Sequence, residues 1–382
     1  MSLLTLSPIA LACLISLGIV SLLLLVYYLG LFGPFVFRKE KSRTSNEDLP
    51  PISIVITAHN EAHHLVESLP VILTQEYPDY EVVLVNDNSQ DEIEQLALEL
   101  NNRYHHLHYV NMGSSRSTME GRKFPFAIGI QAAANPTVVF TNSSCIPSSP
   151  FWLQHIASKF VRQKEVVLAH TTYQSRGGLL NKWLHYDALV NSVRAFSYTL
   201  AKMPVLADSH NLAFKRHLFF DNKEKFFALS RLPFGEDNIF INQVANGKMC
   251  DVAVDPEAVI YQTPISFSDW LRNKRYELVS QSYYRAMHRF VLQCYNWLSF
   301  LFYPAAIACI ALAAQEMNWL ALGIGVGVIL LKFGMQFLVF HKGAKKMGEK
   351  GAAVSLFFFD LFFLLLQPWI YLASKFEKSR WI

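Results

Sequence analysis

The sequence predicts an α/β domain with a doubly wound, mostly parallel sheet, attached to transmembrane α-helices. Between residues 51 and 141, short β-branched apolar segments alternate with helix-like segments, which is typical of a parallel sheet. On either side, apolar stretches approach the roughly 20 residues that a bilayer-spanning helix requires. Hydrophobic residues make up 52% of the 382 residues and charged residues only 17%. This composition is too apolar for an ordinary soluble domain, so we expect part of the chain to face lipid.

The first apolar stretch covers residues 9–37. No Lys or Arg precedes it, it is longer than the core of a signal peptide, and no small-residue cleavage site follows. By the positive-inside rule, the basic residues that follow place its C-terminal side in the cytoplasm. We therefore expect a transmembrane helix in residues 1–37, a basic linker in 38–50 and a cytoplasmic domain in 51–285. The basic residues of the linker are Arg38, Lys39, Lys41 and Arg43.

Two further spans are predicted at residues 290–314 and 319–340, within a C-terminal membrane region that covers 286–382. Basic residues flank this pair of helices on the side expected to be cytoplasmic, in agreement with the orientation of the first helix. These residues are Arg272, Lys274, Arg275, Arg285 and Arg289 before the pair, and Lys342, Lys345, Lys346 and Lys350 after it.

The fourth apolar stretch, residues 353–373, supports more than one interpretation. If it spans the membrane, the basic tail that follows lies outside, against the rule. It could instead be re-entrant or lie in the membrane interface. Its acidic residue, Asp360, is a candidate functional residue because intramembrane acids are costly. Alternatively, Asp360 pairs with Lys332 or lies inside the helix bundle.

The α/β segment contains four predicted strands and three helices between them. The strands are residues 52–57, 81–85, 107–110 and 137–141, and the helices are residues 62–74, 92–101 and 124–134. Polar clusters follow three of these strands, at residues 58–61, 86–91 and 142–145. Ligands of open parallel sheets bind beyond the C-terminal ends of the strands, so these clusters predict a binding site at that edge.

Six motifs occur in an order that resembles family 2 glycosyltransferases. They are residues 54–61 (IVITAHNE), 85–91 (VNDNSQD), 121–130 (GRKFPFAIGI), 140–147 (FTNSSCIP), 211–216 (NLAFKR) together with 235–242 (GEDNIFIN), and 270–276 (WLRNKRY). The resemblance covers residues 51–284. It implies the GT-A fold, a Rossmann-like doubly wound sheet that binds nucleotide-diphospho-sugars.

The resemblance implies roles for residues of the first three motifs. Ala58, Asn60 and Glu61 would help to hold the base and ribose of the donor. Asp87 would accept hydrogen bonds from the uracil or ribose, although Asn86 replaces the first acid of that motif. Lys123 would reach the diphosphate.

The fourth motif departs from the family pattern at its metal site. Family members carry a DxD pair that binds Mg²⁺ or Mn²⁺, and here Asn142 and Ser144 occupy the two acidic positions. A divalent cation on a diphosphate prefers anionic oxygen ligands. Three outcomes stay open: a metal-independent enzyme, replacement by another acid, or loss of activity.

The last two motifs imply the catalytic groups. Asp237 matches the catalytic base, with Glu236 beside it, and a base is required because the acceptor hydroxyl loses its proton as it attacks. Arg275 would neutralise the leaving diphosphate. Arg272 and Tyr276 replace the Gln and Trp of processive members, so processive synthesis is not inferred.

The predicted function is transfer of a sugar from a nucleotide-diphospho-sugar to a membrane-associated lipid or lipid-linked glycan acceptor, with inversion. The alternative is an inactive homologue that acts as a partner or scaffold for an active transferase. A net charge of only +4 without a basic stripe argues against a nucleic-acid polymer as partner. Five cysteines without a CxxC pair support neither a zinc site nor a disulfide scaffold.

Overall fold

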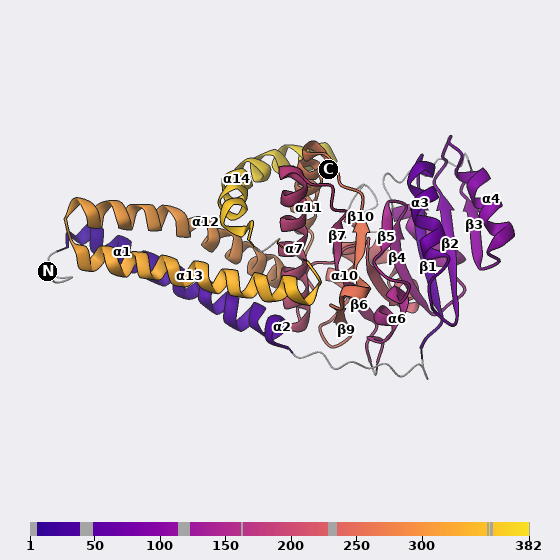
Figure 1. Cartoon of the computed structure of the whole chain (residues 1–382), viewed down its shortest axis with the longest axis horizontal. Coiled ribbons are helices and arrows are strands. Elements are labelled where there is room, and N and C mark those ends of the chain that lie inside the picture. The colour runs from indigo at the N-terminus through magenta and orange to yellow at the C-terminus, as the bar shows by residue number, and fades with distance from the viewer. Residues whose placement is uncertain are drawn as a thin grey trace.

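The computed structural model describes residues 6–38, 49–113, 123–161, 163–227, 235–349, 351 and 354–381. An α/β domain lies at one end of the molecule, and a bundle of long helices extends from it (Figure 1). The predicted fold class, a mostly parallel sheet combined with helices long enough to cross a membrane, is confirmed.

The central sheet has the strand order β3-β2-β1-β4-β8-β6-β9. Its first four strands are parallel, and β8 runs antiparallel to both β4 and β6. The parallel strands are β1 (Ile52–Ala58), β2 (Tyr80–Asn86), β3 (Leu107–Asn111) and β4 (Thr137–Asn142). The others are β6 (Val166–Ala169), β8 (Leu212–Lys215) and β9 (Cys250–Ala253). All four predicted strands are present, each within a residue or two of its expected ends.

Helices cover both faces of this sheet, as a doubly wound fold requires. On one face, α3, α4 and α6 pack against the side chains that include Ile54 and Leu84. On the other face, α5 packs against Val55 and Val85, and a Cβ at Gly129 would lie 2.3 Å from Val55 Cγ1, so only glycine permits this approach. These helices are α3 (Ala62–Ile72), α4 (Ile93–Arg103), α5 (Lys123–Ala132) and α6 (Trp152–Ala157).

The later elements extend the domain toward the membrane helices. A small sheet with the order β5-β10-β7 lies beside the central one. Its strands are β5 (Cys145–Pro147), β7 (Thr171–Tyr173) and β10 (Ile260–Gln262). The helices are α7 (Gly178–Leu200), α8 (His217–Asp221), α9 (Lys223–Phe227), α10 (Glu236–Val244), the 3₁₀ turn η4 (Pro256–Ala258) and α11 (Phe267–Gln281).

Among the described residues, three helical segments are long and apolar enough to cross a membrane. They are Pro8–Phe37, which is built from α1 (Pro8–Val26), the π-helix η2 (Tyr27–Phe32) and α2 (Gly33–Phe37), then α12 (Ala286–Gln315) and α13 (Trp319–Lys346). The fourth apolar stretch forms α14 (Leu356–Trp381), which is not one of these candidates. It curves beside the part of the bundle nearest the α/β domain and packs on α11 (Figure 1).

Asp360 of α14 has the partner that one interpretation of the sequence assigned to it. Its Oδ2 lies 3.4 Å from Lys332 Nζ and accepts a 2.6 Å hydrogen bond from the hydroxyl of Tyr303. Lys332 also donates to Gln336 Oε1 at 2.6 Å. These contacts satisfy the acid within the helix bundle, so a structural role accounts for its presence.

A second polar contact joins the helical hairpin of α12 and α13 to the α/β domain. Glu349, just after α13, accepts hydrogen bonds from His170 Nε2 at 3.3 Å and from His185 Nδ1 at 3.2 Å. The carboxylate is only 6% exposed. The loop after α13 is thereby anchored next to β7 and α7.

Candidate active site

The loops that follow β1 and β2 are joined by hydrogen bonds. The amide of Asp87 donates to the carbonyl of Ala58 at 2.9 Å. Asn60 adopts a positive φ of 55°, its amide donates to Ser89 Oγ at 3.0 Å, and its Oδ1 accepts from the amide of Gln90 at 2.8 Å. Ala58, Asn60 and Asp87 are therefore brought together at the C-terminal edge of the sheet. Asn60 fixes the shape of this edge with both backbone and side chain.

Glu61 connects these loops to the end of β4. Its Oε2 accepts a 2.6 Å hydrogen bond from Ser143 Oγ, and Ser143 lies between the two positions of the substituted metal motif. In the strand register, Thr57 pairs with Asn142. The first, second and fourth strand ends thus form one continuous polar edge.

Asp87 is partly desolvated at this edge. Burial raises its pKa above the usual value, and the nearby His59 opposes that shift. The carboxyl oxygens of Asp87 are acceptors, so they can receive hydrogen bonds from a ribose or base there.

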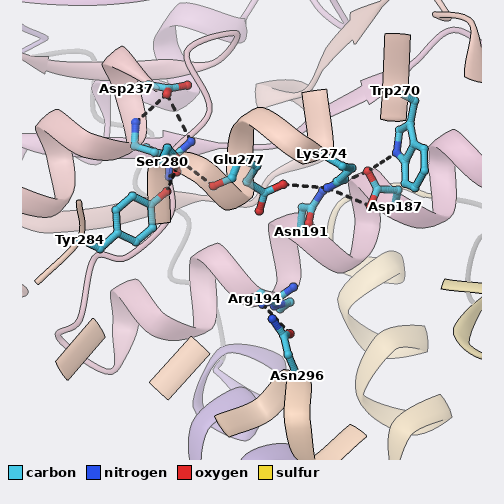
Figure 2. Close-up of polar contacts among 12 residues, drawn as sticks. Asp187, Asn191, Arg194, Asp237, Trp270, Lys274, Glu277, Ser280, Tyr284 and Asn296 are labelled. Carbon is cyan, nitrogen blue, oxygen red and sulfur yellow. Dashed lines mark hydrogen bonds and ion pairs between the residues drawn. The ribbon is translucent and has the colours of Figure 1, made fainter. Parts of the chain in front are cut away.

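A cavity of about 590 Å³ lies next to this edge, between the sheet and helices α7, α10 and α11. Ser144 and Asp237, from two separate motifs, both line it. Residues of α7 and α11 also line it, and Figure 2 shows how Asp187, Lys274 and Glu277 of these helices lie relative to one another. The polar members of this lining include Asp187, Asn191, Asp208, His210, Arg272, Lys274 and Glu277.

Asp237 is held in the first turn of α10. Its Oδ2 accepts a 2.8 Å hydrogen bond from the amide of Ser209, and its Oδ1 accepts a 2.6 Å bond from the amide of Asn238 (Figure 2). Gly235 caps the helix with a φ of +75°, and a Cβ there would lie 3.0 Å from that of Ser280. Glycine at this position therefore permits the sharp turn that presents Asp237 to the cavity.

The electrostatic surroundings of Asp237 suit a proton acceptor. Burial raises its pKa, and the negative charge of Asp208 raises it further. For Asp208 itself, burial alone would raise the pKa, but the adjacent His210 outweighs burial and lowers the pKa to about 2. Asp208 therefore stays charged at neutral pH, and Asp237 has the higher proton affinity of the two.

Lys274 of α11 lies at the centre of a buried charge network. Its Nζ lies 3.1 Å from Asp187 Oδ1 and 3.0 Å from Glu277 Oε2. Asp187 Oδ2 also accepts hydrogen bonds from Trp270 Nε1 at 3.0 Å and Asn191 Nδ2 at 3.2 Å (Figure 2). Burial lowers the pKa of Lys274, but the two carboxylates outweigh it and raise the pKa above its usual value. The network fixes α11 against α7 along one wall of the cavity.

The chemistry at the metal motif does not fit a Mg²⁺ or Mn²⁺ site. Asn142 and Ser144 present neutral oxygens, and Asn142 Oδ1 is buried without a hydrogen-bond partner within the described residues. The described part of the chain also contains no group of three His, Cys, Asp or Glu residues placed to hold a metal ion. Neutral oxygens compensate little of a dication's charge, so no chemical step is assigned to a metal here.

Ser144 and Asp237 line the cavity, whereas the predicted residues of the polar edge lie beside it and are not part of its lining: Ala58, Asn60, Glu61, Asp87 and Asn142. Three other predicted residues also lie outside the cavity lining or outside the described residues. Lys123 begins α5 and is buried, with 2% exposure, and it does not line the cavity. Arg275 lies on α11 between two residues that do line the cavity, but is not itself part of the lining. The backbone of Glu236 begins α10, whereas its side chain lies outside the described residues, as do Gly121 and Arg122 of the third motif.

Sequence reasoning did not identify Asp208, His210, Asp187 or Lys274 as site residues. A signal was present for the first two, because Asp208-Ser209-His210 directly precedes the motif at residues 211–216. Asn211 of that motif is structural: its Nδ2 donates to the carbonyls of His170 and Ala258, and its Oδ1 accepts from Trp152 Nε1. It positions the loop from which Asp208 reaches the cavity.

Comparison with known proteins agrees with this geometry. Residues 53–223 match the family described as Glycosyl transferase family 2. This segment is therefore similar to family 2 glycosyltransferases. The matched segment contains all four parallel strands and the loops that form the polar edge, and it ends before Asp237.

Curated glycosyltransferases are similar to this chain over short alignments. Glycosyltransferase AglE from Haloferax volcanii is 27% identical over 108 residues, 28% of this chain and 34% of its own length. An uncharacterised glycosyltransferase from Rickettsia prowazekii is 36% identical over 64 residues, 17% of this chain and 20% of its own length. The chain therefore spans about a third or less of these curated relatives.

A solved structure shares the fold at low sequence identity. The mannosyltransferase PcManGT from Pyrobaculum calidifontis, in complex with GDP-Man and Mn²⁺, superposes with a TM-score of 0.52 and 15% identity. The likeness covers 90% of this chain and 99% of that one. It extends the similarity from the matched segment to the remainder of the fold.

Proposed function

We propose that this protein transfers a sugar from a nucleotide-diphospho-sugar to a lipid or lipid-linked acceptor at the membrane surface. The observation that carries the proposal is the position of Asp237. It is a partly buried carboxylate of raised pKa, in a cavity that begins at Ser144 beside the polar edge of the sheet. A donor that binds its nucleoside at that edge would extend its sugar into the cavity.

In the proposed mechanism, Ala58, Asn60, Glu61 and Asp87 hold the nucleoside. Asp237 accepts the proton of the acceptor hydroxyl as that oxygen attacks the anomeric carbon from the face opposite the leaving diphosphate, which inverts the configuration. Cationic side chains supply the compensation for the leaving group that a metal would otherwise provide. Lys123 and Arg275 remain the candidates by family resemblance, and Arg272 is a third because it lines the cavity.

We also propose the arrangement in the membrane. Residues 1–37 and 286–346 would anchor the protein through three spans, and residues 51–285 would form a cytoplasmic domain. Basic residues on the domain side of the helices support this orientation. Both the donor and the proposed catalytic base would then lie in the cytoplasm, and the acceptor would be presented from the inner leaflet.

The neutral side chains of Asn142 and Ser144 favour one alternative, an inactive homologue that acts as a partner for an active transferase. The test is a donor-turnover assay on the purified, membrane-reconstituted protein with a panel of UDP- and GDP-sugars, with EDTA or Mn²⁺ present. We expect release of UDP or GDP from one class of donor. Absence of release from every donor, with lipid extract supplied as acceptor, would support the partner role instead.

A further inference from the structure

A second hollow, of about 340 Å³, lies between α11, α12 and α14, on the membrane side of the candidate active site. One part of its wall is apolar and includes Leu278, Trp297 and Phe300. Trp297 and Phe300 belong to α12, a candidate membrane span. The hollow therefore opens where a hydrocarbon chain could enter from the bilayer. We call it the α12–α14 groove.

The groove and the cavity that contains Asp237 lie on either side of a third, smaller hollow. This hollow is a narrow passage of about 30 Å³. Gln281, Asn296 and Gln367 line both the groove and the passage, whereas Lys274 and Glu277 line both the passage and the cavity. The passage admits little more than one water molecule, so a head group that reaches the cavity must displace side chains lining it.

The outer surface of α14 indicates that lipid surrounds this groove. Phe358, Leu361, Leu365, Trp369 and Phe376 recur at helical spacing, and Phe358 is 81% and Trp369 76% exposed. The opposite face of the helix is apolar as well and packs against α11 and α7. A helix that is apolar on both faces but buries only one is stable at a membrane interface rather than in water.

The passage at the inner end of the groove carries a buried cation, Arg194, which lies over the ring of Tyr295 at 5.5 Å and forms no salt bridge among the described residues. Arg194 of α7 is 6% exposed and lines the passage. It donates to Asn296 Oδ1 at 3.3 Å, and its Nε has no hydrogen-bond partner among the described residues (Figure 2). Lys274, the other cation of the passage, is already paired with Asp187 and Glu277. A guanidinium with an unused donor is suited to a phosphate oxygen.

We propose that the α12–α14 groove binds the lipid acceptor, with its hydrocarbon chain along the apolar wall and a phosphate-bearing head group at Arg194. This inference rests on the proposed transfer to a lipid. It gives that acceptor a defined entry route, from the bilayer past Asn296 into the cavity at Lys274 and Glu277.

The test is photo-crosslinking of the full-length protein in nanodiscs, without donor. The probe is phosphatidic acid with a diazirine in its acyl chain, and the comparison is phosphatidylcholine with the same labelled chain. We expect phosphatidic acid to label peptides of α12 around residues 293–300 and of α14 around residues 367–372 about threefold more than phosphatidylcholine does. Arg194→Gln should remove that preference, Arg194→Lys should retain part of it, and Asn296→Trp, which fills the groove, should lower labelling by both probes.

The matched control is Ile307→Trp, at a position of α12 that is 68% exposed and outside the groove. It should leave the labelling unchanged, and thermal unfolding in detergent should confirm that every variant is folded. Equal labelling by both probes, unaltered by Asn296→Trp and Arg194→Gln, would mean bulk lipid contact only and would overturn the proposal. Because crosslinking needs no turnover, it separates failure of the groove from failure of the transferase. If the wild type transfers sugar and Asn296→Trp leaves the KM for the lipid acceptor unchanged, the acceptor does not bind in the groove. The proposed transferase activity would then be retained.

Discussion

Lys274 Nζ of α11 and Asp187 Oδ1 of α7 lie 3.1 Å apart, at the boundary between the candidate active site and the passage toward the membrane. Both side chains are nearly buried, with about a tenth of each exposed. Glu277 shares the same ammonium group. This pair therefore links the two helices that form one wall of the cavity.

The first prediction concerns this pair. Lys274→Met should lower the melting temperature clearly, because it leaves Asp187 and Glu277 buried without their cation, which typically costs about 3–5 kcal/mol. Lys274→Arg keeps the charge and should cost less. Thermal unfolding in detergent with a fluorescent dye measures the difference. Equal melting temperatures for wild type and Lys274→Met would show that the network does not hold α11 in place.

The second prediction concerns the pH dependence of activity. The proposed base acts when deprotonated, so kcat/KM should fall below the pKa of Asp237, which is raised by burial and by Asp208. Asp208→Asn removes the neighbouring negative charge, lowers the pKa of Asp237, and should move the acidic limb of the pH profile to lower pH. A limb that stays in place or moves to higher pH would contradict the assigned electrostatics.

The third prediction concerns metal dependence. The wild-type activity should change by less than about threefold between EDTA and Mn²⁺, because Asn142 and Ser144 supply only neutral oxygens. The double variant Asn142→Asp/Ser144→Asp restores two carboxylates and should gain stimulation by Mn²⁺. Donor turnover with titrated Mn²⁺ measures both. Complete loss of wild-type activity in EDTA would show that other residues hold a metal.

The fourth prediction concerns the anchor at Glu349. Burial alone would raise its pKa, but hydrogen bonds from His170 and His185 outweigh burial and hold the pKa well below its usual range. The carboxylate therefore stabilises the fold fully above its unfolded pKa of about 4.3, and this contribution is lost as the pH falls through the lower folded value.

Glu349→Gln should therefore lower the melting temperature at pH 6.5, by an amount equivalent to about 2 kcal/mol for charge-assisted hydrogen bonds. The deficit relative to wild type should shrink below about pH 4.3. Glu99→Gln, on the exposed face of α4, is the matched control and should have no effect. A deficit that is independent of pH would exclude the ionised carboxylate as its source.

Most of the sheet could be predicted from sequence, because its strands are short, buried and separated by regular helices. The segment 52–57, for example, is β-branched at every position except Ser53, and it forms a strand buried along its whole length. The contact between Asp360 and Lys332 could also be anticipated, since a buried acid and base in the same apolar region tend to pair.

The cavity was harder to predict, because its walls come from segments far apart in the chain. Asp187 and Lys274 are 87 positions apart, and nothing local marks either as a site residue. The motifs identified Ser144 and Asp237, which do share the cavity. They also suggested Arg275, which is not part of the cavity lining. Its neighbour Lys274 lines the cavity instead, because only some positions of α11 face inward.

The central claim is that Asp237 acts as the proton acceptor. The most direct test is to replace Asp237 and to measure both sugar transfer and nucleotide binding in the same variant. Asp237→Asn keeps the shape of the side chain but removes the base, so kcat should fall at least about 100-fold while the Kd for UDP or GDP stays within about threefold of wild type. Glu99→Gln should match wild type in both. Transfer by Asp237→Asn at the wild-type rate would contradict the account.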